Sequence, residues 1–230
     1  NAELVSIAST NIKNLNSFGN NFKIQDNLRF NNYESICKND EIDAIYISTL
    51  NNTHFDLIKM CAMNNKHILC EKPLTMNHLE SMVLLDMAKD AHVFLMEAYM
   101  YRVHPQTFNI LDHLDIFKDS DSPILIKSSF GFSAELPKEH RLRNPLLGGG
   151  AILDVGCYPL SMSKLIAGNL QNLPFADPSS ISATGRIDET GVDLQSEAHL
   201  VFSDTIEATI SCAIDEEYAN DLRISRGTIE

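Results

Sequence analysis

The tripeptide Glu71-Lys72-Pro73 places two opposite charges directly after the apolar run that ends at Cys70. If that run is a strand of a parallel sheet, the tripeptide lies where open α/β folds bind their ligands, outside the carboxyl end of the strand. A lysine there, partly removed from water, can polarise a substrate hydroxyl or exchange a proton with it. A surface charge pair beside a loop proline is the alternative interpretation of so short a motif.

A second stretch, GGGAILDVGCY at residues 148–158, joins a flexible triple glycine to a helix that we expect to begin near Asp154. Asp154 and Tyr158 have the i, i+4 spacing, so they project from one helix face and can reach a common site. A phenol can act as an acid or base, and a carboxylate can orient a substrate. Alternatively, the two residues are a helix N-cap and a packed aromatic side chain.

Polar residues also follow an earlier β-rich run. Ser9, Thr10 and Asn11 stand where an acidic residue of a Rossmann unit would accept the ribose hydroxyls of NAD. No acid is present, and these small polar side chains, with Lys13 nearby, favour the 2′-phosphate of NADP over NAD. The same residues can simply cap the following helix.

The segment TLNNTH at residues 49–54 follows another β-rich run. Its polar groups, among them Thr49, Asn51 and His54, can line the phosphate and ribose path of a dinucleotide. A helix cap at Asn52 or Thr53 is the alternative.

The candidate residues must be positioned by strands and helices that the sequence also predicts. Short β-rich runs lie at residues 4–8, 44–48, 67–70 and 93–96, and segments with helical periodicity separate them. This alternation predicts a doubly wound parallel sheet with crossover helices. One helix has an apolar stripe at Leu15, Phe18 and Phe22. A later helix has another at Leu79, Met82, Val83 and Met87, and begins with a capping-box-like pair, Asn77 and Glu80.

The pattern changes after residue 102. A helix is expected at 104–114, another after Asp154, and strands at 124–132, 181–187, 198–202 and 206–213. We therefore predict a nucleotide-binding domain at 1–102 and, at 103–230, an α+β domain with a largely antiparallel open sheet.

Composition excludes several classes of partner. The net charge of −13 would repel nucleic acid and anionic membranes, and no apolar run approaches a bilayer-spanning length. The five cysteines have no metal-ligand spacing, so we expect no metal site, and isolated thiols favour the cytoplasm. No leader is recognisable, and the chain starts and stops within strand-like stretches, so we expect it to be cut at both ends.

Taken together, the strings EIDAIYIST, NNTH, KHILCEKPLTMN, FLMEAYMYRVHPQ and GGGAILDVGCYPL closely resemble the Gfo/Idh/MocA oxidoreductases over nearly the whole chain. Tyr158 stands where other members have histidine. A tyrosine there makes the sequence resemble the branch that contains glucose-fructose oxidoreductase, xylose dehydrogenase and dimeric dihydrodiol dehydrogenase.

The resemblance implies a Rossmann domain, a second domain whose open sheet often forms oligomer contacts, and a substrate cleft between them. It implies that Lys72 is catalytic, often with a cis bond before Pro73, that Tyr158 is the acid or base, and that Asp154 orients the substrate. Glu97 matches a position beside the nicotinamide, and Arg102 one at the substrate end. The cofactor contacts expected are Ser9, Thr10, Asn11, Thr49, Asn51, His54, Glu71, Lys72, Pro73 and Glu97. A homo-oligomer, dimeric or tetrameric, is expected.

Departures from the family pattern are also visible. The first strand and its G-x-G-x-x-G turn are not in this chain, so we expect these residues alone to bind dinucleotide poorly. Leu50 replaces a customary proline, which affects the local loop shape, and the closing strands of the second domain are not included.

The expected reaction is reversible hydride transfer between NADP, or NAD, and the carbinol carbon of a sugar, polyol or cyclic diol. Tyr158 would take the hydroxyl proton while Lys72 stabilises the negative charge that develops. Two rivals remain. A dinucleotide-binding regulator on the same fold need not keep both residues, and a nicotinamide-dependent glycosidase would share E-K-P but differ in the substrate-side motif.

Overall fold

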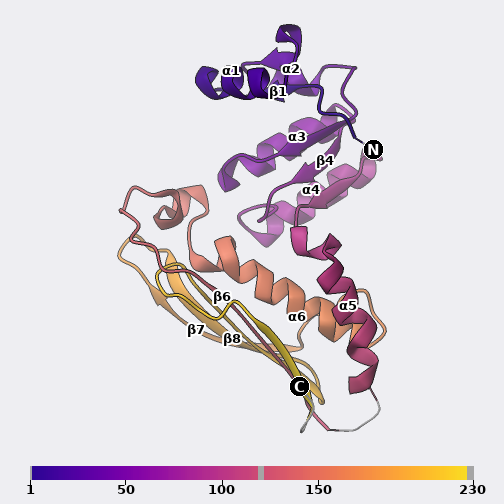
Figure 1. Ribbon diagram of the computed structural model, residues 1–230, viewed down its shortest axis with the longest axis vertical. Coiled ribbons are helices and arrows are strands. Elements are labelled where there is room, and N and C mark those ends of the chain that lie inside the picture. The colour runs from indigo at the N-terminus through magenta and orange to yellow at the C-terminus, as the bar shows by residue number, and fades with distance from the viewer. Residues whose placement is uncertain (1, 119–121, 227–230) are drawn as a thin grey trace. The chain divides into compact units, whose positions relative to one another are not determined.

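The computed structural model describes residues 2–118 and 122–226, which fall into two compact units, Asn1–Ala98 and Tyr99–Glu230 (Figure 1). The first unit contains the strands β1 (Ile7–Ala8), β2 (Arg29–Phe30), β3 (Ala44–Ile47), β4 (His67–Cys70) and β5 (Leu95–Glu97). Its helices are α1 (Ile12–Asn21), α2 (Tyr33–Cys37), α3 (His54–Met63) and α4 (His78–Asp90). Short 3-10 turns lie at η1 (Asp26–Leu28) and η2 (Asn51–Thr53).

All strand pairs in the first unit are parallel, which confirms the predicted Rossmann-type arrangement. β3, β4 and β5 form one sheet in that order, and β1 pairs with β2 in a second. In the first of these sheets Ile47 aligns with Cys70, and Cys70 with Glu97. The three strands therefore end in register, and the residues that follow them gather at one edge.

The first unit has a largely aliphatic core. Its predicted helices are confirmed, but two of them do not bury most of the apolar side chains that the sequence predicted to face the core. Ile58, Ile68 and Leu84 are among its fully buried side chains. On α4 the predicted stripe is largely exposed, with 76% of Leu79 accessible, whereas Leu84 and Ala88 face the core. On α1 only Leu15 of the predicted stripe is buried. Because apolar residues surround most of α4, periodicity could not identify its inward face.

The second unit consists of one mixed sheet with two helices on one of its faces (Figure 1). The order is β10 (Leu222–Arg226), β6 (Ile124–Gly131), β9 (Ile206–Ala213), β8 (Asp193–Ser203), β7 (Ser180–Ile187). Only β6 and β9 are parallel, so the predicted largely antiparallel sheet is confirmed. The helices are α5 (Pro105–His113) and α6 (Cys157–Leu170). Short turns lie at η3 (Met100–Val103), η4 (Leu114–Phe117), η5 (Arg141–Arg143) and η6 (Pro145–Leu147).

A tight glycine segment precedes α6. Gly148 and Gly150 have φ of 71° and 110°, which non-glycine residues rarely adopt. A Cβ on Gly150 would also lie 2.2 Å from an Asp193 carboxylate oxygen. The chain then makes a π-helical turn, η7 (Ile152–Gly156), before α6 begins. The predicted helix start is thus confirmed, with a wider first turn, of a kind often found at functional sites.

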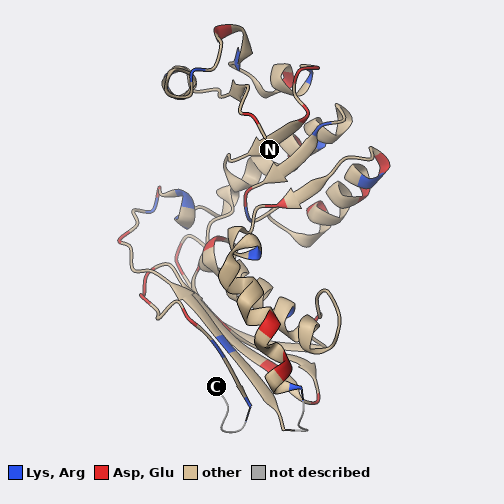
Figure 2. Cartoon of the chain, turned by 45° about the vertical axis from the view of Figure 1, so that its right-hand side comes forward, with Lys and Arg blue, Asp and Glu red and all other residues tan. Residues whose placement is uncertain are grey.

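Charged residues of both signs are spread along the chain, with acidic ones in excess (Figure 2). Within the described ranges, no three or more potential ligands cluster as a metal site would require. None of the helices described is both long and apolar enough to cross a membrane.

Candidate functional site

Glu71, Lys72 and Pro73 lie immediately beyond β4, at the carboxyl edge of the parallel sheet. The Lys72–Pro73 bond is cis, in agreement with the resemblance. Pro73 is buried, and Glu71 and Lys72 are half-buried. Neither residue is fully exposed, and their catalytic role stays a prediction.

The Glu71 carboxylate is held from two sides. The Tyr46 hydroxyl on β3 donates a hydrogen bond to Oε1, and the Lys72 backbone N–H donates to Oε2 at 3.3 Å. The hydrogen bond to Glu71, aided by burial, raises the pKa of Tyr46 to about 12. Glu71 thus has a fixed orientation beside the candidate catalytic lysine.

Two further side chains bind the backbone around Pro73. Oε1 of Glu97, the last residue of β5, accepts the Leu74 N–H at 2.8 Å. His54, at the start of α3, places Nδ1 2.9 Å from the Pro73 carbonyl oxygen and Nε2 3.3 Å from that of Thr49. Both residues were predicted to meet the cofactor, and both bind the protein's own backbone here.

At the end of β1 the structure shows the helix cap that was one of the two interpretations. Asn11 Oδ1 accepts the N–H groups of Lys13 and Asn14 at 3.0 and 3.2 Å. Ser9 Oγ accepts the Asn11 N–H at 3.2 Å, and Thr10 is exposed. Their contact with a cofactor stays a prediction.

The segment after β3 is similarly ordered by its own side chains. Thr49 Oγ1 and Thr53 Oγ1 lie 2.6 Å apart, and Thr53 Oγ1 donates to the Leu50 carbonyl at 2.7 Å. Asn51 begins the η2 turn and is half-buried. Leu50, where the resemblance implies a proline, takes an extended conformation with φ −74°, which a proline could also adopt.

In the second unit, Asp154 is buried in the π-helical turn and pairs with Arg141, whose Nη2 lies 3.5 Å from Oδ1. The Asp154 side chain is 13% exposed, and that of Arg141 is 45% exposed. The pair thus combines a shielded carboxylate with a guanidinium that solvent or a ligand can reach.

Tyr158 is one helical turn further on, and its ring is packed by aromatic neighbours. The ring centroids of Tyr99, Phe130 and Tyr101 lie 5.5, 5.4 and 6.2 Å from that of Tyr158. The Tyr99 contact is edge-to-face, a favoured geometry. These contacts restrict the direction in which the Tyr158 hydroxyl can point.

Arg102 is engaged with α6. Its Nη2 donates to Ser161 Oγ at 2.9 Å and its Nε to the Tyr101 hydroxyl at 2.8 Å. The guanidinium also stacks over the Phe175 ring, 4.1 Å from the centroid. Burial raises the pKa of Tyr101, although Ser161 and Arg102 partly oppose this. Arg102 therefore buttresses the aromatic group around Tyr158.

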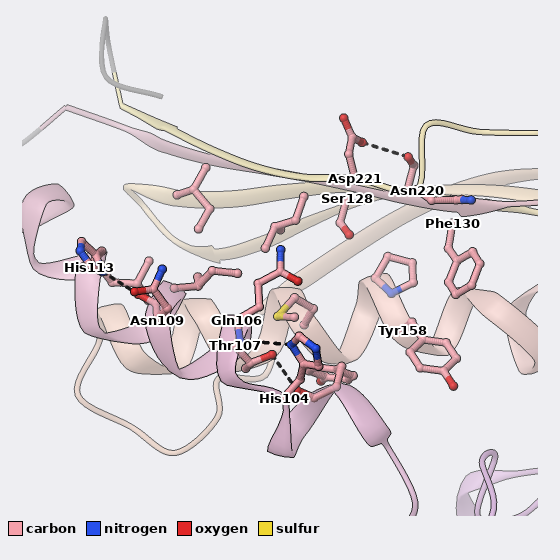
Figure 3. Close-up of a pocket in the computed structure, with 18 of the residues that line it drawn as sticks. His104, Gln106, Thr107, Asn109, His113, Ser128, Phe130, Tyr158, Asn220 and Asp221 are labelled. Carbon is pink, nitrogen blue, oxygen red and sulfur yellow. Dashed lines mark hydrogen bonds between the residues drawn. The ribbon is translucent and has the colours of Figure 1, made fainter.

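A cavity of about 750 Å³ lies between α5, α6 and the strands β6 and β10. Figure 3 shows the Tyr158 ring beside Phe130 at one end of this cavity, with its hydroxyl directed away from the middle. Because the hydroxyl of Tyr158, the predicted acid or base, points elsewhere, we do not assign this cavity as the substrate site.

Sequence reasoning missed Tyr46, Arg141 and the aromatic neighbours of Tyr158. Tyr46 sits in an otherwise apolar strand, where its polar tip was the available signal. Arg141 precedes Asp154 by a glycine-rich loop, so no helical spacing relates the two residues.

Comparisons with known proteins find two family matches, one in each of the two compact units. Residues 1–99 match the oxidoreductase family with an NAD-binding Rossmann fold, GFO_IDH_MocA. Residues 122–228 match the GFO/IDH/MocA C-terminal domain.

Individual relatives cover most of this chain. It is 32% identical over 230 residues to trans-1,2-dihydrobenzene-1,2-diol dehydrogenase of Xenopus tropicalis, covering 99% of this chain and 66% of that protein. It is 31% identical over 187 residues to D-xylose 1-dehydrogenase (NADP(+)) 2 of Haloferax volcanii, covering 81% and 54%. A solved 3-ketoreductase from Actinomadura kijaniata, in complex with NADP and TDP-benzene, superposes with a TM-score of 0.82 at 25% identity, covering 98% and 66%. The chain thus spans about two thirds or less of each relative's length.

Proposed function

Because the chain belongs to the Gfo/Idh/MocA oxidoreductase family, we propose that the protein transfers a hydride between NAD(P) and a hydroxyl-bearing carbon of a sugar, polyol or cyclic diol. The observation that carries this proposal is the half-buried Lys72 directly after β4, at the sheet edge where open α/β folds bind ligands. Relatives named as dehydrogenases of a diol and of a sugar support the substrate class.

The residues at this edge fit a dinucleotide. The aligned strands β3 and β4 are followed by Thr49 and by Glu71 and Lys72, which offer hydroxyl, carboxylate and ammonium groups to a ligand. The end of β1 carries Ser9, Thr10 and Asn11 and no acid, which favours NADP over NAD. When bound, the cofactor supplies the carbon that accepts or returns the hydride.

The protein's own side chains supply the proton chemistry. In the oxidation direction Tyr158 accepts the hydroxyl proton of the substrate, and in reduction it returns that proton. Lys72 stabilises negative charge on the substrate oxygen through its ammonium group. Asp154, shielded and paired with Arg141, orients the substrate by accepting hydrogen bonds from its hydroxyl groups.

A spectrophotometric assay tests the proposal. The full-length protein is mixed with NADP or NAD and a panel of aldoses, polyols and cyclic diols, and the absorbance of the reduced nicotinamide is followed. We expect one substrate class to be turned over, with kcat reduced by roughly 100-fold or more in Lys72→Ala and Tyr158→Phe. Lys59→Ala and Tyr33→Phe are matched controls on α3 and α2. Cofactor binding without turnover across the panel in either direction would contradict the proposal.

We also propose that the protein acts in the cytoplasm as a homo-oligomer. Its five cysteines are free, and thiols persist in a reducing compartment. Within the described residues no helix covers the second face of the β10–β7 sheet, which leaves that face for subunit contacts (Figure 1). Light scattering of the purified protein, which we expect to report a dimer or tetramer, tests the assembly.

A further inference from the structure

The His54 ring lies fully buried between two backbone carbonyls. No part of the residue is accessible to solvent. Nδ1 is 2.9 Å from the Pro73 oxygen, and Nε2 is 3.3 Å from the Thr49 oxygen. This ring therefore connects the segment after β3 with the segment after β4.

Both partners of the ring are acceptors, so the ring must donate. A neutral imidazole carries one N–H, and the shorter contact indicates that this N–H is on Nδ1 and points to Pro73. Without this donor the Pro73 carbonyl would lose its partner in a buried place, which is costly.

A second tie comes from another element. The N–H of Leu74, the next residue, donates to Glu97 Oε1 at 2.8 Å. The backbone immediately after Lys72 is therefore held by α3 through one residue and by β5 through the next. Because Lys72 is joined directly to this held backbone, the root of its side chain is fixed relative to the sheet.

We propose that His54 is a positioning residue for Lys72: its Nδ1–H binds the Pro73 carbonyl and holds the Pro73–Leu74 peptide, which lies one residue after the lysine. With its N–H on Nδ1, the ring has no proton on Nε2 to donate, so the 3.3 Å approach to the Thr49 oxygen is a packing contact only. The reaction part of this inference rests on the proposed function. Because His54 is fully buried, it acts through the backbone and not by direct contact with the cofactor.

Two substitutions separate the two contacts. The amide nitrogen of asparagine can take the place of Nδ1, and that of glutamine the place of Nε2. We expect His54→Asn to keep kcat within about threefold, because its side-chain amide can still donate to the Pro73 carbonyl oxygen. We expect His54→Gln to lower kcat by roughly 10- to 100-fold, because small misplacements of a catalytic group have effects of that order. His78→Asn and His78→Gln, at an exposed histidine, are the controls.

Equal kcat losses in the two His54 variants would overturn the proposal, since a residue that only fills the core would not distinguish them. Hydrogen exchange gives a readout that needs no turnover. The Lys72 and Leu74 amides should exchange faster in His54→Gln than in the wild type, and close to the wild-type rate in His54→Asn. If exchange is the same in all three proteins, the contact does not hold this peptide. If the wild type turns over no substrate, the proposed function fails. The exchange rates alone then decide whether His54 holds the Pro73–Leu74 peptide.

The wild-type protein provides a check that needs no folded variant. Nitrogen-15 NMR of the His54 ring should show a proton on Nδ1. A ring protonated on Nε2 alone would overturn the proposal.

Discussion

Arg141 and Asp154 form an ion pair across the glycine loop, with 3.5 Å between Nη2 and Oδ1. If Asp154 orients the substrate, Arg141 should affect substrate binding more than the transfer step. We expect Arg141→Ala to raise KM for the substrate by up to about fivefold, the size of a partly exposed pair, with KM for NADP unchanged. Steady-state kinetics test this, with Arg223→Ala, whose partner is Asp221, as the control. An equal rise in both KM values would contradict the role given to Asp154.

The hydrogen bond from Tyr46 to Glu71 predicts a titration in the alkaline range. The folded-state pKa of Tyr46, about 12, lies above the usual 10.0, so the stabilisation is complete below pH 10 and is lost as the pH rises through 12. The difference in ultraviolet absorbance between wild type and Tyr46→Phe isolates this group. Glu71→Gln should lower the Tyr46 pKa toward 10.0, because the bond to Glu71 is the largest cause of its shift. An unchanged titration in Glu71→Gln would show that burial, not the hydrogen bond, dominates.

The sequence predicted helices and strands well where a periodic apolar pattern was bounded by residues that cap or end an element. β4 has the predicted bounds, and Asn77 caps α4 by accepting the Glu80 N–H at 3.0 Å. The run at 4–8 gave only a two-residue strand, because its partner β2 is equally short. The apolar pattern of β2 spans too few residues to be distinguished from a loop.

The candidate site was predictable as residue types, but not as contacts. E-K-P and the Asp154–Tyr158 spacing are local, so they can be read from neighbouring letters. The partners of these residues come from distant segments, as Tyr46 does for Glu71 and Phe130 for Tyr158. His54 shows the difference: its position in the motif suggested a ligand contact, which stays a prediction, whereas its contact with the Pro73 backbone could not be read from the sequence.

A third prediction concerns acid stability of the second unit. Asp188, whose side chain is 2% exposed, binds Arg143 Nε at 2.6 Å, and this contact lowers the pKa of the carboxyl below its usual 3.8. Its stabilisation is therefore present above about pH 4 and is lost as the pH falls through the lowered pKa. We expect Asp188→Asn to lower the melting temperature by several degrees at pH 7, with a smaller difference at pH 3.

The matched control is Asp177→Asn. Asp177 also pairs with a cation, Lys164, but its side chain is 87% exposed, so solvent screens the interaction. We expect little change in its melting temperature at either pH. Comparable losses in the two variants would show that burial does not strengthen the Asp188 pair.

The turn that carries Asp154 and Tyr158 depends on a glycine between them. A Cβ on Gly156 would lie 2.7 Å from Cys212 Sγ and 3.3 Å from Cys212 Cβ. Both residues are buried, so the new methyl group cannot turn toward solvent. We expect Gly156→Ala to destabilise the protein by about 1–3 kcal/mol in urea unfolding, the usual cost of overpacking. It should also lower kcat, since the displaced turn carries both candidate site residues.

Removing the obstructing sulfur should reverse much of this effect. In Gly156→Ala/Cys212→Ala the new methyl group occupies the space that Sγ leaves, so the two changes should be non-additive by about 1 kcal/mol or more. Cys70→Ala removes a buried thiol of the first unit and should combine additively with Gly156→Ala. Recovery of kcat together with stability would show that the close approach of Gly156 to β9 sets the position of the turn. Additive losses in both double variants would mean that a neighbour other than Cys212, such as the Ala151 carbonyl oxygen 3.4 Å from the Cβ position, excludes a side chain.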